Sequence, residues 1–525
     1  MFEQAAIVGQ PEADRAGLSV LKKGGNAVDA AVTTALLSSV VMPSQCGIGG
    51  YGGVLLVYVN GEVTCIDFNT AAPLAAKPNM FPVVSSDGRS GSFVKDRVNE
   101  VGPLAISVPG VLAGLNLALE RFGTLSMSEA LAPAIRACKN GFRISASYVS
   151  QVEEYERRIR MFPETENLLQ VGDELPKSGD RVKNTHLAKV LEQISNKGTE
   201  EFYKGRIADR IVTYLQENGG ILTKEDFEAY RPRVVESVRG SCAGYDLYTA
   251  PLCHNGLSLL QMLRIAEVAD LGHWARDTGR FAHGMVEAIR ASWLDRYRHF
   301  GDPSKVQVPR ERLLSDAHLK ATGEEVSGHV SEGTRGQCLM RPPGSGGTTH
   351  ISVVDADRNM VSLTFTHGPG YGSFVTIPRM GLLMNSGMSR FDPGPGLPNS
   401  IAPGKIPINN MCPVIILGDG QPVMTIGGSG GTRISTSLLQ VLARCLCMDE
   451  DLAWAISAPR VHAEGNEWAM VEEEFGETAP AYLKEVGYKL RKGLAAAKVR
   501  AIEVTDSGEL HAVIDPRLGG REKGY

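Results

Sequence analysis

Neither sign of charge dominates this sequence, and no stretch of it gathers like charges into a tail. The 54 Lys and Arg residues stand against 59 Asp and Glu residues, which gives a net charge of -5. Proteins that bind nucleic acids need a basic surface to neutralise phosphates. We therefore expect no nucleic-acid partner.

Long hydrophobic runs are also missing. The longest apolar stretch, AAVTTALLSSVVMP at residues 30–43, contains Thr and Ser and is shorter than the roughly 20 residues that span a bilayer. The first fifteen residues, MFEQAAIVGQPEADR, have neither the basic nor the apolar segment of a secretory leader. We therefore expect a cytoplasmic protein with no membrane partner.

The cysteines lack the spacing typical of zinc ligands or of a disulfide framework. The nine cysteines are scattered from Cys46 to Cys447, and none forms a CxxC pair. No Cys and His residues cluster with zinc-ligand spacing. This pattern favours free thiols in a reducing compartment and predicts no metal or other cofactor.

The remaining patterns predict separate helical and strand regions. Helical spacing covers residues 11–41, 112–227 and 257–298, with a break at GG in the first of these. An Asn60-Gly61 turn between two apolar runs predicts a hairpin. Residues 321–347 are rich in Gly, Ser, Thr and Pro and predict a flexible loop. Segregated helices and strands favour an α+β fold over a doubly wound parallel sheet.

A second hairpin is predicted directly after that loop, in TTHISVVDADRNMVSLTFTHG from Thr348. A turn centred on Asp357 pairs residues whose numbers sum to 714, so Val353 faces Val361 and Thr348 faces Thr366. Opposed side chains in a strand pair lie about 4.5–5.5 Å apart at Cβ. The alternative interpretation is a Thr pair on a solvent-exposed face, because Thr favours strands.

The flexible loop directly before Thr348 suggests a reaction for these threonines, which is cleavage of the chain. Cleavage of the Gly347–Thr348 bond would give Thr348 a free α-amine beside its own hydroxyl. The unperturbed pKa of such an amine is about 7.7–8.0, so it can act as a general base near neutral pH. Nucleophile and base would then belong to one residue.

At these residues the chain resembles the gamma-glutamyltranspeptidase family of N-terminal-nucleophile hydrolases. The likeness spans nearly the whole chain and includes LKKGGNAVDAAV, GIGGYGG, ISVPGVLAGL, GTLSMSEALAPAI, GDP, TTHISVVD and GGSGGTRI. It implies a four-layer αββα sandwich and self-cleavage before Thr348. The resulting pieces, 1–347 and 348–525, would form a heterodimer within one structural domain, and a higher oligomer is left open.

The resemblance also implies catalytic roles. Thr348 is the nucleophile and Gly347–Thr348 the processed bond. Thr366 matches the threonine that hydrogen-bonds the new N-terminal residue. Gly430 and Gly431 match the glycine pair whose N–H groups form the oxyanion hole, and such donors are each worth roughly 10²–10³ in rate.

The substrate side departs from the family pattern. Asn69 stands where transpeptidases hold the glutamate carboxylate with Arg, and Gly387 and Arg390 stand where acidic or amide residues hold its α-amino group. Asn409 and Asn410 replace a serine pair. Losing one partner of a buried charge pair costs about 2–5 kcal/mol, or some 30-fold or more in γ-glutamyl binding.

Three functions follow from these residues. The first is a threonine amidohydrolase acting on a small carboxylate-bearing amide, with Arg390 on the carboxylate; an oxamate-like compound is one example. The second is a γ-glutamyltransferase or glutathione hydrolase with a different set of glutamate contacts. The third is an inactive scaffold or binding protein of the same fold. His367 is a further candidate for substrate contact, and the alternative is a strand-end histidine without a role.

Overall fold

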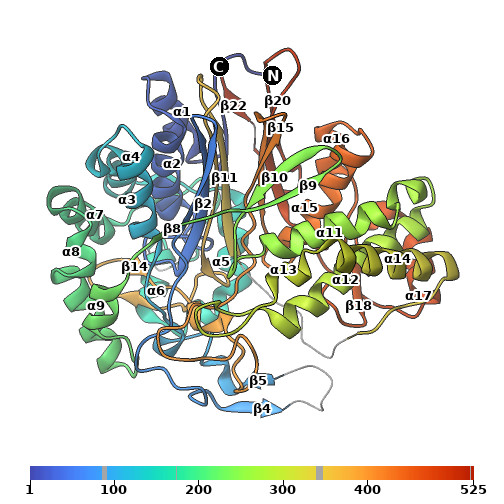
Figure 1. Cartoon of the computed structure of the whole chain (residues 1–525). Coiled ribbons are helices and arrows are strands. Elements are labelled where there is room, and N and C mark those ends of the chain that lie inside the picture. Colours follow the sequence, from blue (N-terminus) through green and yellow to red (C-terminus); the bar gives the residue numbers. More distant parts are fainter. Residues whose placement is uncertain (86–91, 173, 339–346, 521) are drawn as a thin grey trace.

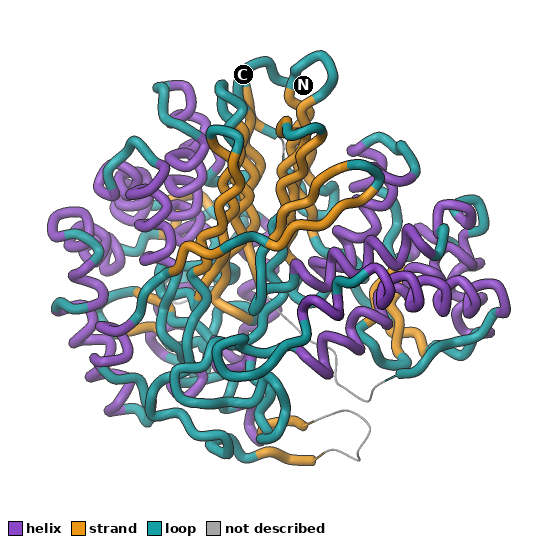
Figure 2. Tube along the Cα trace, viewed as in Figure 1, coloured by secondary structure: helices purple, strands orange, loops and turns teal. Residues whose placement is uncertain are grey.

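The computed structural model describes residues 1–85, 92–172, 174–338, 347–520 and 522–525. Two β-sheets lie face to face at the centre of the molecule, and helices cover the outer face of each sheet (Figures 1 and 2). This arrangement is the four-layer αββα sandwich that the resemblance implied. Both termini lie at the same end of the central sheets (Figure 1).

Within the described residues the first sheet has seven strands and the second has six. The order in the first sheet is β22 (Lys523–Gly524), β1 (Ala6–Val8), β11 (Gly347–Val354), β12 (Met360–Gly368), β2 (Gly52–Val59), β3 (Glu62–Asp67) and β8 (Arg233–Val235). The order in the second is β21 (Leu510–Ile514), β20 (Lys498–Val504), β16 (Gln421–Ser429), β15 (Val414–Gly418), β10 (Tyr245–Thr249) and β9 (Val238–Cys242). Each sheet therefore contains strands from before and from after Thr348.

The helices form two outer layers. The layer over the first sheet consists of α1 (Asp14–Lys22), α2 (Ala27–Val41), α3 (Val111–Phe122), α4 (Met127–Asn140), α7 (Thr185–Lys197), α8 (Glu200–Tyr203), α9 (Arg206–Glu217) and α10 (Lys224–Ala229). The layer over the second consists of α11 (Gly256–Val268), α12 (Thr278–His299), α13 (Arg310–Leu313), α14 (Asp316–Glu332), α15 (Arg433–Leu442), α16 (Leu452–Ser457) and α17 (Thr478–Glu485). Helices α5 (Ala146–Ile159) and α6 (Pro163–Leu169) lie near the lower ends of the strands.

Helix α2 shows how local sequence sets the first layer. The Asn26 side chain accepts hydrogen bonds from the N–H groups of Val28 and Asp29, and the Asp29 carboxylate accepts one from the N–H of Asn26. This capping box satisfies N–H groups that the helix itself leaves unpaired. Every residue of α2 is buried, because the helix lies between β11 and β12 on one side and other helices on the other.

The two predicted hairpins are both present. Asn60 and Gly61 have positive φ angles of 51° and 84°, as a tight turn between paired strands requires, and they join β2 to β3. In the second hairpin, β11 pairs with β12 as predicted, with Val353 opposite Val361. The register shifts between Gly347 and Thr349, and Gly347 faces Gly368. The predicted opposition of Thr348 and Thr366 is therefore altered at the strand end.

The flexible loop predicted for residues 321–347 is partly wrong. Helix α14 continues to Glu332, with Ser315 accepting a hydrogen bond from the N–H of His318 at its start. Its buried residues include Leu319, Val326 and Val330, a sparse but helical spacing that the surrounding Gly and Ser residues obscured. The stretch RPPGSG at 341–346 lies outside the described residues.

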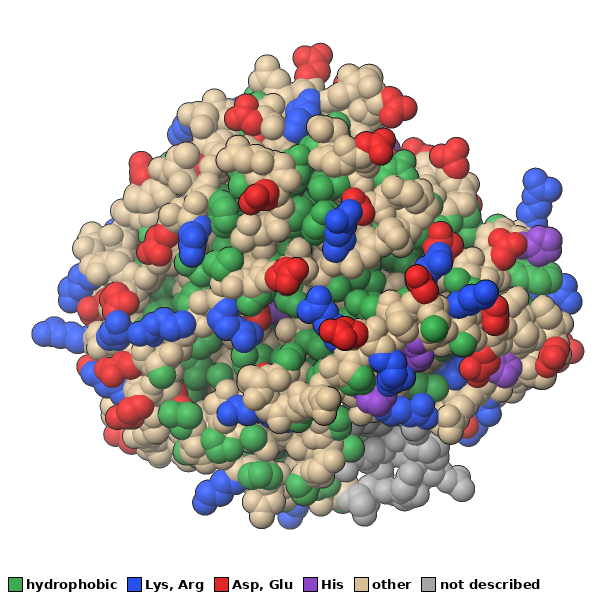
Figure 3. Space-filling model, in the orientation of Figure 1, with side chains coloured by type: hydrophobic (Ala, Val, Ile, Leu, Met, Phe, Trp, Pro, Cys, Tyr) green, Lys and Arg blue, Asp and Glu red, His purple; other side chains and the backbone are tan. Residues whose placement is uncertain are grey.

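The surface fits the even balance of charges. Acidic and basic side chains alternate over the visible face, without a large area of one sign (Figure 3). Among the helices that the structure describes, none combines the length and the apolar character that crossing a bilayer would take. All nine cysteines are free thiols.

Candidate active site

Thr348 lies at the beginning of β11, where the hairpin reaches the edge of a small cavity. Its side chain is 6% exposed, and its Oγ1 lies 2.5 Å from the carbonyl oxygen of Gly347. The cavity, of about 10 Å³, is also lined by Tyr51, Thr366 and Arg390. The remaining lining residues are Gly347, Gly368, Asn410, Met411 and Gly431.

Thr366 is directed at the same carbonyl group. Its hydroxyl donates to the Gly347 carbonyl oxygen at 2.5 Å and accepts from the Gly368 N–H at 2.8 Å. The Gly368 N–H occupies a lone pair of the Thr366 hydroxyl oxygen, so the hydroxyl proton remains free to point at the Gly347 carbonyl oxygen. Two hydroxyl groups therefore converge on the Gly347–Thr348 peptide group.

The glycine pair follows strand β16 on the facing sheet. Gly430 and Gly431 have φ angles of 152° and 65°, which side chains would oppose. The Arg433 guanidinium donates to the Gly430 carbonyl oxygen at 3.1 Å. Within the described part of the chain neither glycine N–H has an acceptor, so both remain available to an oxyanion. Gly431 lines the cavity, whereas Gly430 does not.

Arg390 and Asn410 are the predicted substrate contacts that line the cavity. Arg390 ends the short turn η4 (Gly387–Arg390), and its Nε and Nη2 atoms lie 3.2 and 3.1 Å from Ser389 Oγ. Asn410 Oδ1 accepts from Arg296 Nη2 at 3.2 Å. These contacts hold a cation and an amide at the cavity wall.

Asn409 is held in place by a buried hydrogen-bond network that includes His254 and Asp67. His254 lies between Asp67 and Asn409, with its Nε2 3.0 Å from Asp67 Oδ1 and its Nδ1 3.1 Å from Asn409 Oδ1. Burial alone would raise the pKa of Asp67, but His254 and Arg233 outweigh it and lower that pKa to about 2. Asn409 Nδ2 has no hydrogen-bond partner among the described residues.

Arg296 on helix α12 contacts Asn409 and Asn410 from the outer helical layer. Its Nη1 donates to Asn255 Oδ1 at 2.7 Å, and its Nη2 donates to the Asn409 carbonyl oxygen at 2.7 Å. Asn255 in turn donates to Ser435 Oγ at 2.7 Å, on the helix that follows the glycine pair. Sequence patterns alone missed His254 and Arg296, because their partners lie far away along the chain.

Four predicted substrate contacts lie outside the cavity, Asn409 among them, and His367 lies on the opposite face of its sheet. It follows Thr366 on β12, so its side chain points to the opposite face of the sheet, where a Cβ on Gly47 would lie 2.3 Å from its Nε2. Burial lowers the pKa of His367 to about 3. The residue lines a separate, mainly apolar cavity beside Ile48 and Leu383.

Asn69 and Gly387 lie outside the cavity for different reasons. The Asn69 amide donates to the Pro407 carbonyl oxygen at 2.8 Å and accepts from the Thr70 N–H at 2.9 Å, so it braces backbone rather than the cavity. A larger residue would not fit at Gly387, because its Cβ would lie 1.8 Å from Ser107 Oγ. Both positions shape the site from outside.

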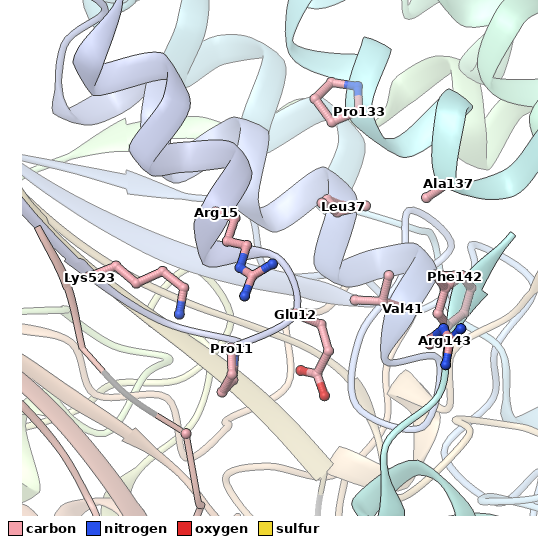
Figure 4. A pocket seen from close by; sticks show the side chains of 11 residues that line it. Pro11, Glu12, Arg15, Leu37, Val41, Pro133, Ala137, Phe142, Arg143 and Lys523 are labelled. Carbon is pink, nitrogen blue, oxygen red and sulfur yellow. The ribbon is translucent and has the colours of Figure 1, made fainter. Parts of the chain in front are cut away.

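A more spacious cavity, of about 760 Å³, lies between α1, α2, α4 and the C-terminal segment. Arg15, Lys523 and Arg143 surround it together with apolar residues such as Leu37 and Val41 (Figure 4). None of the predicted site residues lines it. The larger cavity is therefore not the candidate reaction site. That site is the small cavity where the two hydroxyl groups converge.

Comparison with known proteins agrees with this geometry. The family model described as gamma-glutamyltranspeptidase matches residues 13–525. The chain belongs to the gamma-glutamyltranspeptidase family. It is accordingly an amidohydrolase or acyltransferase of the N-terminal-nucleophile type.

Relatives in the family carry two kinds of name. The chain is 32% identical to a glutathione hydrolase proenzyme of Escherichia coli (strain K12), over 96% of this chain and 89% of that protein. It is also 32% identical to the acylase ACY 1 proenzyme of Pseudomonas sp. (strain SE83), over 96% and 90%. The crystal structure of cephalosporin acylase from Bacillus halodurans superposes with a TM-score of 0.88 at 26% identity, covering 100% of this chain and 96% of that one.

Within the described ranges no three His, Cys, Asp or Glu side chains are grouped as metal ligands. The polar groups around the cavity are hydroxyl, guanidinium and amide groups and glycine N–H groups. Such groups can supply a nucleophile, hydrogen-bond donors and a positive charge.

Proposed function

We propose that this family member is a self-processing threonine amidohydrolase. The observation that carries the proposal is the convergence of two hydroxyl groups, those of Thr348 and Thr366, at 2.5 Å from the Gly347 carbonyl oxygen. Thr348 Oγ1 attacks the Gly347 carbonyl carbon, an ester forms and the C–N bond to Thr348 breaks. The released nitrogen takes the hydroxyl proton and becomes the α-amine, and water then hydrolyses the ester to free the Gly347 carboxylate.

After processing the same atoms act on substrate. The α-amine of Thr348 accepts the proton of its hydroxyl, and Oγ1 attacks the amide carbonyl of the substrate. The N–H groups of Gly430 and Gly431 stabilise the oxyanion. The acyl–oxygen bond forms, the amine leaves with the proton, and water or another amine releases the acyl group and restores Thr348.

The acyl group is proposed to be a small one bearing a carboxylate. Arg390 supports this proposal because it lines the same cavity as Thr348, and a guanidinium group matches carboxylate geometry. The cavity is narrow, which favours compact acyl groups, and oxamate is one amide of this class. The acylase names of relatives add that the family accepts more than one acyl group.

The processed enzyme would be a heterodimer of residues 1–347 and 348–525. The proenzyme names of relatives support this arrangement, as does the presence of strands from both pieces in each sheet.

The test is a denaturing gel of purified protein followed by an amide screen. Processing should give bands of about 37 and 19 kDa, by residue share of 56.4 kDa. A single band after long incubation would contradict the proposal and favour an inactive scaffold. Processed protein should then hydrolyse small carboxylate-bearing amides, and Arg390→Met should lower kcat/KM for these at least tenfold more than for uncharged amides.

The second candidate is γ-glutamyl hydrolysis or transfer, which the glutathione hydrolase names favour. Here Arg390, Asn409 and Asn410 would supply new contacts to glutamate. Rapid release of nitroaniline from a γ-glutamyl anilide would support this candidate over the first.

A further inference from the structure

Tyr51 is a cavity residue that no sequence pattern singled out. It stands within GIGGYGG, immediately before β2, and lines the cavity together with Thr348 and Arg390. Its side chain is 3% exposed. Among the described residues its hydroxyl has no hydrogen-bond partner, and it is not enclosed by protein atoms either. Tyr hydroxyl groups usually have a hydrogen-bond partner when the ring is buried, so this hydroxyl can donate to a ligand in the cavity that Tyr51 lines.

The surroundings of Tyr51 explain why the ring fits. A Cβ on Gly387 would lie 3.0 Å from the Cβ of Tyr51, so the missing side chain at 387 makes room for the ring. Burial raises the pKa of Tyr51 to about 12, and the nearby positive charge of Arg390 opposes part of this effect. The hydroxyl therefore stays protonated at neutral pH and can donate.

We propose that Tyr51 determines acyl specificity, its hydroxyl and the Arg390 guanidinium together binding a carboxylate of the acyl group. This inference rests on the proposed function and narrows its substrate class. A carboxylate accepts hydrogen bonds from both partners. An ammonium group would instead meet a cation, and no carboxylate is present among the described residues that line the cavity. The favoured substrates are therefore monoamides of dicarboxylic acids without an α-amino group.

Three anilides of matched length separate these features. Glutaryl-p-nitroanilide carries the carboxylate, the γ-glutamyl compound adds an α-amino group, and pentanoyl-p-nitroanilide replaces the carboxylate by a methyl group. We expect the processed enzyme to prefer the glutaryl compound to both others. Tyr51→Phe should lower the ratio of kcat/KM for glutaryl over pentanoyl by about 10-fold to 100-fold, as the loss of a hydrogen bond to a charged group predicts.

Tyr58→Phe is the matched control. Tyr58 lies on β2 in the same buried cluster as Tyr51 but does not line the cavity, so this variant should leave the ratio within about twofold. Thermal unfolding of both variants checks that each is folded.

The outcomes are distinct. Equal losses for all three anilides in Tyr51→Phe would overturn the role of Tyr51 and leave the amidohydrolase intact. A preference for the γ-glutamyl compound would overturn the substrate class. If no anilide is hydrolysed, calorimetric binding of glutarate against pentanoate still decides: glutarate must bind more tightly, and Tyr51→Phe must remove about tenfold or more of that difference. The absence of self-cleavage would instead refute the proposed function.

Discussion

The hydroxyl of Thr366 should control the rate at which the chain cuts itself. It donates to the Gly347 carbonyl oxygen at 2.5 Å, the atom on which negative charge develops when Thr348 attacks. Thr366→Val removes this donor while keeping the shape of the side chain. Removing one such donor typically slows a reaction by about 10²–10³, or about 2.7–4 kcal/mol. A precursor that matures in minutes would then take hours to days.

The assay is cell-free synthesis followed by a time course on denaturing gels, which records conversion of the intact band. Thr366→Ser is the control, because it keeps the hydroxyl and the acceptor for the Gly368 N–H. It should mature within about tenfold of the unmodified chain, since only a methyl group is lost. Maturation of Thr366→Val within threefold of the unmodified rate would refute the assignment of this hydroxyl to the scissile carbonyl.

Three further predictions follow from neighbouring groups. Thr348→Ala should remain one chain indefinitely, whereas Thr348→Ser should still be cut, as a gel would record. His254→Ala should lower the free energy of unfolding in urea by about 1–3 kcal/mol at pH 7, because it removes one hydrogen-bond partner of the buried Asp67 carboxylate, which keeps Arg233; the exposed His186→Ala should change it by less than about 0.5 kcal/mol. His367 is neutral in the folded state above pH about 3 and takes up a proton below about 6.5 when unfolded, so stability falls as pH drops through that window. Between pH 4 and 6, His367→Leu should reduce the slope of unfolding free energy against pH by about 1.4 kcal/mol per unit.

The hairpin and the family motifs made much of the fold predictable. The strands after Thr348 were readable because β-branched residues flank a tight turn, and the count of paired positions holds from Thr349 to Val354. Helix α14 was missed because its buried stripe of Leu319, Val326 and Val330 is thin for its length. Such a helix is stabilised by packing against α11 and α12 more than by its own sequence.

The site was predictable where chemistry depends on neighbours along the chain. Gly347, Thr348 and Thr366 belong to one hairpin, so their meeting follows from local pairing. The cavity wall is different, because Tyr51, Arg390 and Asn410 come from segments brought together only by the fold. Arg390 and Asn410 were expected there from the family resemblance alone, and Tyr51 was missed. His367 lies outside the cavity for a simpler reason: successive side chains along a strand point to opposite faces, so the residue beside Thr366 points away from the cavity.

Each sheet is built from strands of both pieces, and this has a consequence for how the cut protein behaves. Strands β11 and β12, both after Thr348, pair on either side with β1 and β2, which precede it. Once the bond before Thr348 is broken, the two pieces cannot part without opening the first sheet, so they should not trade places with pieces from other molecules under native conditions. Refolding, in contrast, becomes an encounter of two separate chains, each with unpaired strand edges prone to aggregate. A single peptide bond thus decides whether this protein can recover from heat: Thr348→Ala should refold after melting, and the matured enzyme should not.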